Sequence, residues 1–72
     1  MFHAGMETDL NSYLERAERC IVIGETTVTR QLALLERLRH ANLPTGDAER
    51  LLREMELTLH RFYAEREKIM GR

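Results

Sequence analysis

The stretch CIVIGETTVT, residues 20–29, decides whether this chain is all-helical or contains a strand. Seven of its ten residues are β-branched and a glycine stands in the middle. A half-buried strand would alternate apolar and polar residues, but here three apolar residues follow one another and three polar residues follow Gly24. β-Branched residues cost a helix only tenths of a kcal/mol each. The sequence therefore predicts a helix through this stretch.

The apolar pattern around this stretch supports a helix. A first row of positions alternates spacings of four and three: Leu10, Leu14, Ala17, Ile21, Gly24, Val28, Gln31, Leu35 and Leu38. A second row follows the same rule: Ala48, Leu52, Met55, Leu59, Phe62, Arg66 and Ile69. Such heptad spacing is typical of long helices that pack along a seam, as in coiled coils.

The segment ANLPTGD, residues 41–47, separates the two rows. Proline ends helices, Gly46 can form a turn, and Asp47 is a good N-cap. We predict a helix over about residues 9–40, a turn over 41–47 and a helix over about 48–70. Residues 1–8 are expected to be a flexible leader, because Met6 could itself be a start codon; MFHAG lacks the features of a signal peptide.

Composition limits the class of protein. The chain has 72 residues, which is one small domain, and a formal net charge of −1. No run reaches the ~18 apolar residues of a membrane span. Cys20 is the only cysteine, which fits a reducing cytoplasmic setting. The predicted fold is an all-α, antiparallel two-helix hairpin.

The helix lengths predict a partner. Helices of about 32 and about 23 residues are ~48 Å and ~35 Å long, so the second covers the first only back to about residue 18. Apolar residues would then overhang or lie off the seam: Leu10, Tyr13, Leu14, Ala17, Ile23 and Leu34. One neighbouring helix cannot cover so broad a stripe. We expect a homodimer of hairpins that forms a four-helix bundle.

Gly24 lies at a position where a large neighbour is expected. The hairpin geometry places it opposite about residue 64, near Phe62 and Tyr63. We interpret it as a gap that accommodates an aromatic ring. A phosphate-binding loop is the alternative, but GETTVT lacks a second glycine and a lysine.

Two polar residues lie on the seams. Gln31 is expected near Thr58 and Leu59, and Arg66 near Val22, within reach of Glu18 or Glu25. We interpret Gln31 and Arg66 as a polar layer that fixes the register of the helices. A buried site for an anionic ligand is the alternative.

Other side chains suggest a sensor or a nucleic-acid binder. Glu36 with His40, and Glu56 with His60, share helix faces and could each hold a metal, and Cys20 could be a reactive thiol near Arg16 and Arg19. The arginines Arg37, Arg39, Arg50 and Arg53 near the turn could contact phosphates, although acidic residues are interleaved with them.

IGETTVTRQLALLERL and AERLLREMELTLHRFYAER resemble short, uncharacterised two-helix proteins of alphaproteobacteria. The resemblance covers about residues 15–69 and rests on Gly24–Glu25, Arg30–Gln31, Leu34, Leu35, Leu38, Leu59–His60 and Arg66. It implies a helical hairpin in a bacterial cytoplasm, and the resembled proteins have no assigned activity to carry over.

No catalytic grouping or cofactor motif emerges, so we predict that the chain is not an enzyme and has no cofactor. The leading hypothesis is a protein–protein interaction module, an adaptor or regulator that binds itself and another protein. The overhang at residues 9–17 would suit recognition of a helix in a groove. The nucleic-acid-binding regulator and the metal- or thiol-based sensor are the alternatives.

Overall fold

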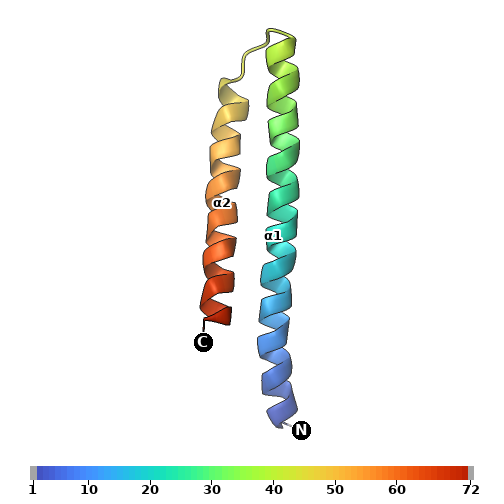
Figure 1. Cartoon of the computed structure of the whole chain (residues 1–72), viewed down its shortest axis with the longest axis vertical. Coiled ribbons are helices and arrows are strands. Elements are labelled where there is room, and N and C mark those ends of the chain that lie inside the picture. The colour runs from blue at the N-terminus through green and yellow to red at the C-terminus, as the bar shows by residue number, and fades with distance from the viewer. Residues whose placement is uncertain (1, 72) are drawn as a thin grey trace.

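The chain folds into two antiparallel helices that form a hairpin (Figure 1). The computed structural model describes residues 2–71, and the surroundings of side chains from Leu10 to Gly71. Helix α1 spans Phe2–His40 and helix α2 spans Gly46–Met70. The molecule is a rod of 60 × 16 × 14 Å. The described residues contain no strand, so the prediction of an all-α two-helix hairpin is confirmed.

Residues 20–29 are helical throughout, as the spacing predicted. The hydroxyl groups of Thr27 and Thr29 donate hydrogen bonds to the carbonyl oxygens of Ile23 and Glu25, at 2.7 and 2.9 Å. These bonds keep the threonine side chains satisfied inside a helix. Ile21 is buried against α2, and this packing outweighs the weak helix propensity of the β-branched residues.

Helix α1 begins earlier than the sequence predicted. The prediction was a flexible leader over residues 1–8, but α1 starts at Phe2; Met1 lies outside the described residues. Between Phe2 and Asp9 no proline interrupts the chain, and an existing helix extends at little cost per residue. Figure 1 shows this first part of α1 projecting beyond the end of α2.

Helix α1 ends in a Schellman motif at Asn42. The N–H of Leu43 donates to the carbonyl oxygen of Leu38 at 2.9 Å, and the N–H of Asn42 donates to that of Arg39 at 3.0 Å. Asn42 has a φ of 57°, the left-handed conformation that this motif requires. The prediction that Gly46 forms the turn was wrong, because asparagine tolerates the left-handed conformation and Gly46 is the first residue of α2.

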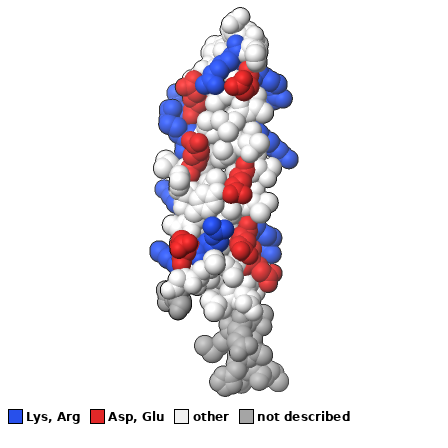
Figure 2. All heavy atoms as spheres, viewed as in Figure 1, with Lys and Arg blue, Asp and Glu red and all other residues white. Residues whose placement is uncertain are grey.

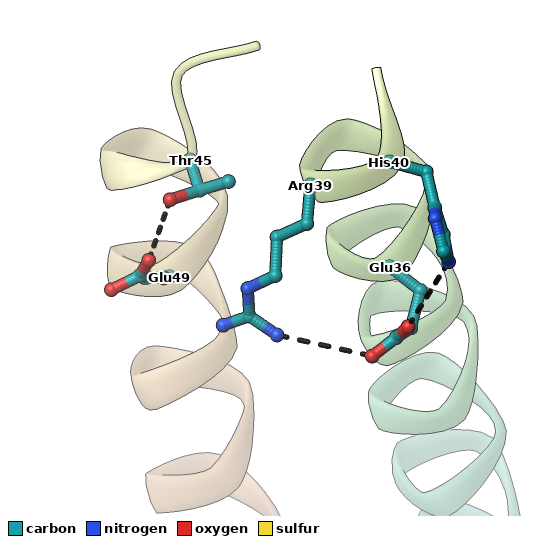
Figure 3. Close-up of polar contacts among 5 residues, drawn as sticks. All are labelled: Glu36, Arg39, His40, Thr45 and Glu49. Carbon is teal, nitrogen blue, oxygen red and sulfur yellow. Dashed lines mark hydrogen bonds and ion pairs between the residues drawn. The ribbon is translucent and has the colours of Figure 1, made fainter. Parts of the chain in front are cut away.

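Helix α2 starts two residues before its predicted beginning, with Thr45 and not Asp47 at the N-cap position. The carbonyl oxygen of Thr45 accepts the N–H of Glu49 at 2.8 Å, and the Thr45 hydroxyl donates to Glu49 Oε2 at 2.6 Å (Figure 3). Asp47 lies in the first turn, where negative charge interacts favourably with the helix dipole.

The second helix is displaced along the first relative to its expected position. Gln31 was expected near Thr58 and Leu59, but its Nε2 donates to the carbonyl oxygen of Ala48 at 3.0 Å. The chain after Asn42 runs back along α1 before α2 begins, and Figure 1 shows α2 starting below the end of α1. Helix α2 therefore reaches further toward the start of α1 than residue 18.

This displacement corrects the predicted overhang. Ala17 is buried and Leu14 is half-buried, whereas Leu10 and Tyr13 are both 56% exposed. Ile69, near the end of α2, lines surface hollows together with Tyr13 and with Leu10. The overhang consists of the first turns of α1 and does not extend to residue 17.

The core of the hairpin is a narrow stripe. Its buried members are Ala17, Ile21, Gln31, Leu35 and Leu59. Large apolar side chains remain exposed outside it: Leu10, Tyr13, Val22, Ile23, Leu32, Leu43, Leu51, Leu57 and Met70. Two helices in contact can each bury only one stripe, so the rest of the apolar surface stays open.

Candidate protein-interaction surface

An apolar groove runs along one face of the hairpin. It consists of two hollows that share Phe62. The lower hollow, of about 410 Å³, lies toward the start of α1 and the end of α2. It is lined by Tyr13, Arg16, Ala17, Cys20, Phe62, Glu65 and Ile69. The upper hollow, of about 320 Å³, is lined by Ile23, Gly24, Thr27, Leu51, Glu54, Met55, Thr58 and Phe62.

Heptad spacing explains why the two hollows are continuous. Tyr13, Cys20 and Thr27 are seven residues apart, so they form one edge of the α1 seam. Leu51 and Thr58 follow the same spacing on α2, and Glu65 extends their row. The groove lies between these two rows, on the side that neither helix covers.

Gly24 forms the floor of the upper hollow. A Cβ atom at this position would lie 3.0 Å from Leu59 Cδ1 and 3.5 Å from Phe62 Cδ2. The nearest atoms at the predicted gap thus belong to Leu59 and to Phe62, one of the two aromatic residues expected there. The absence of a side chain at Gly24 lets α2 approach closely and leaves the Phe62 ring half-buried at the junction of the hollows.

A cluster of three side chains, which we call the polar clasp, bridges the helices at Tyr63. The Tyr63 hydroxyl donates a hydrogen bond to Glu25 Oε2 at 2.5 Å. The guanidinium carbon of Arg66 lies 5.7 Å from the centre of the Tyr63 ring, a cation–π distance. Arg66 was expected to reach Glu18 or Glu25, but the structure places it over the ring. The hydrogen bond to Glu25 raises the pKa of Tyr63 above its ordinary value.

Gln31 lies where it can fix the register. It is 7% exposed, and its side chain donates to the backbone of the other helix. A buried amide needs such a partner, because leaving it unpaired costs roughly 1–3 kcal/mol. A shift of α2 along α1 would break this bond.

The arginines near the turn are mixed with carboxylates. Figure 3 shows Glu36 between Arg39 and His40, at 4.0 Å and 3.9 Å. Arg50 Nη1 lies 3.2 Å from Asp47 Oδ1. On the face shown in Figure 2, basic and acidic residues alternate along both helices without a block of one sign. Exposed pairs of this kind stabilise a protein by less than about 1 kcal/mol each.

The candidate sensor residues do not gather at one site. Among the side chains that the structure describes, no three His, Cys, Asp or Glu residues gather as metal ligands would. Cys20 is half-buried in the lower hollow. Glu36 and His40 form an exposed pair on α1.

The groove includes some of the predicted interface residues and adds others. Tyr13, Ala17 and Ile23 line it, whereas Leu10 lies in a smaller hollow beside Ile69 and Leu34 is half-buried on the same edge of α1 as Tyr13. Sequence reasoning missed most of the α2 wall: Leu51, Glu54, Met55, Thr58, Glu65 and Ile69. The spacing of seven from Leu51 to Thr58 to Glu65 was the available signal.

Comparisons of the chain with protein-family models, with curated proteins and with solved structures give no match. Neither helix, within the residues described, has an apolar stretch long enough to cross a bilayer.

Proposed function

We propose that this protein is a non-enzymatic protein–protein interaction module, a small adaptor or regulator that acts as a homodimer. Two hairpins would pack into a four-helix bundle with coiled-coil-like seams. The apolar groove is the observation that carries this proposal, because it leaves apolar side chains of both helices open along one face. Exposed patches of this kind mark interaction sites.

The solvent-accessible surface area of the chain is consistent with a binding partner. The chain exposes 6044 Å², whereas a compact monomer of 8.5 kDa would expose about 4,700 Å² by the usual scaling with mass. An elongated rod of 60 × 16 × 14 Å has a large surface for its mass. A standard interface buries about 800 Å² on each partner, which this surface can supply.

A second protein would bind the dimer elsewhere. The first turns of α1 extend past α2 and present a single helix (Figure 1). A lone helix of this kind can enter a groove of another protein. We place the module in the bacterial cytoplasm, on the basis of the lone Cys20 and the resemblance to alphaproteobacterial hairpins.

The other two hypotheses lack a supporting observation. Carboxylates lie within 4.0 Å of Arg39 and Arg50, two of the turn-end arginines that a nucleic-acid binder would use. The histidines and Cys20 of a sensor are distributed over separate surfaces. The interaction module is therefore the function that the geometry supports best.

Light scattering coupled to size-exclusion chromatography tests this proposal. We expect a particle of twice the 8.5 kDa of the chain. Ile23→Asp should give a monomer, because Ile23 lines the groove and is 64% exposed in the hairpin. Burial of an unpaired carboxylate in a dimer interface is strongly unfavourable.

Val22→Asp is the matched control. Val22 is adjacent in sequence, β-branched and 61% exposed, but it does not line the groove. The control should remain a dimer, and circular dichroism should show both variants to be helical. A wild-type chain that stays monomeric at high micromolar concentration would refute the proposal.

A further inference from the structure

The two walls of the apolar groove differ in side-chain size. The α1 wall carries three small residues, Ala17, Cys20 and Gly24, beside the larger Tyr13 and Ile23. The α2 wall carries large ones, namely Met55, Phe62 and Ile69. Dense packing needs large side chains opposite small ones, because large residues that face each other clash and small residues that face each other leave cavities.

The two walls also differ in charge. Arg16 is the charged residue that lines the groove from α1, and Glu54 and Glu65 are those that line it from α2. The Arg16 guanidinium carbon lies 5.5 Å from the Tyr13 ring centre. Within the described part of the hairpin, no ion pair joins Arg16 to Glu65, so both charges are available to a partner.

From these two differences we infer that a second copy fills the groove with its two-fold axis parallel to the helices. This inference rests on the proposed homodimer. In this arrangement α1 of each copy packs on α2 of the other, so the small wall meets the large wall. Arg16 of each copy then lies level with Glu65 of the second copy, and the contact occurs twice because the interface is isologous.

The other face-to-face arrangement turns the second copy end over end. It would place α1 on α1 and α2 on α2, so Ala17, Cys20 and Gly24 would face the small-residue wall again, and Met55, Phe62 and Ile69 would face the large-residue wall. Glu54 and Glu65 lie near opposite ends of the α2 wall, and Glu54 of each copy would approach Glu65 of the other. Like charges at such a contact are destabilising.

Native mass spectrometry of two charge-reversal variants tests the inference. Arg16→Glu places two acidic contacts in its own homodimer, and Glu65→Arg places two basic contacts in its own. We expect each variant alone to dimerise on the order of tenfold more weakly than the wild type. A heterodimer of the two variants has both contacts complementary, so an equimolar mixture should contain heterodimer well above the statistical half.

The outcomes separate the inference from the proposed function. A statistical 1:2:1 distribution of dimers would overturn the parallel-axis arrangement while leaving the homodimer intact. A monomeric wild type would overturn the homodimer itself. Arg16 and Glu65 are both exposed in the hairpin, so neither reversal should unfold it.

A spin-label distance provides a second measurement that uses no charge change. Cys20→Ser with His40→Cys places one label on each copy at the turn end of α1. The parallel-axis dimer keeps the two labels at the same end, within about 30 Å. The end-over-end dimer would separate them by about 50 Å, which would overturn the inference.

Discussion

The two long faces of the hairpin differ in how the helices meet at the surface. On one, the polar clasp of Glu25, Tyr63 and Arg66 ties the helices together at the surface. On the other, the apolar groove leaves Phe62 half-buried and Ile23 exposed. Phe62 and Tyr63 are neighbours in sequence, yet they belong to these two different surfaces. A polar pair satisfies itself within one chain, whereas an apolar groove stays open until another molecule fills it.

The largest effect should come from Phe62→Ala, which empties the junction of the two hollows. We expect a loss of about 3 kcal/mol in the free energy of unfolding, because a large aromatic side chain leaves a cavity. Urea unfolding at two protein concentrations measures it. The loss should be larger at the higher concentration, where the proposed dimer would be populated; an equal loss at both would mean that Phe62 serves only the hairpin.

A smaller effect is expected from overfilling the groove floor. Gly24→Leu should destabilise the protein by about 1–3 kcal/mol, because the new side chain collides with Leu59 and Phe62. Gly24→Ala is the control, since the tight contact of its Cβ, at 3.0 Å, is with the flexible end of Leu59, and it gains about 1 kcal/mol of helix propensity. A melting temperature that is unchanged in Gly24→Leu would contradict the close packing at this position.

The smallest effect on stability should come from a substitution in the polar clasp. Tyr63→Phe removes the hydrogen bond to Glu25 but keeps a ring beneath Arg66. We expect a slight fall in melting temperature and no change in dimer affinity. Reduced dimer affinity in this variant would show that the partner also contacts this face.

The pH dependence of stability provides a second test of the hydrogen bond between Tyr63 and Glu25. The pKa of Tyr63 is raised in the folded chain above its usual 10.0, mainly by the hydrogen bond to Glu25. Between the unfolded and folded values, the unfolded chain binds fewer protons, so stability falls as pH rises through this window. The fall should begin near pH 10 and be weaker in Tyr63→Phe; identical pH profiles would exclude the clasp as its cause.

The helices and the core stripe could be predicted from sequence because both follow from local periodicity. Ile21, Leu35 and Leu59 lie on the predicted seams and are buried. It was harder to predict on which side of the seam each flanking residue lies, because one position along a helix corresponds to a rotation of about 100°. Phe62 and Tyr63 were both expected near the gap at Gly24 for this reason; Phe62 lies there, and Tyr63 belongs to the polar clasp.

The axial register could not be predicted because it depends on the path of the chain between the helices. The expected turn would have placed Gln31 beside Thr58, but the left-handed Asn42 and the residues after it bring Gln31 to Ala48. The α2 wall of the groove follows from that displacement. Periodicity identifies which residues line a seam, and the connection determines which of them meet.

The connection between Asn42 and Gly46 therefore has a consequence for partner choice. It lines neither hollow, yet its length sets which residue of α2 faces Gly24. A one-residue insertion or deletion there would change the groove profile along its whole length without altering any residue that lines it. In the proposed homodimer, two hairpins with identical helices and different connections would present grooves of different profile, so the loop length would decide which copies can pair.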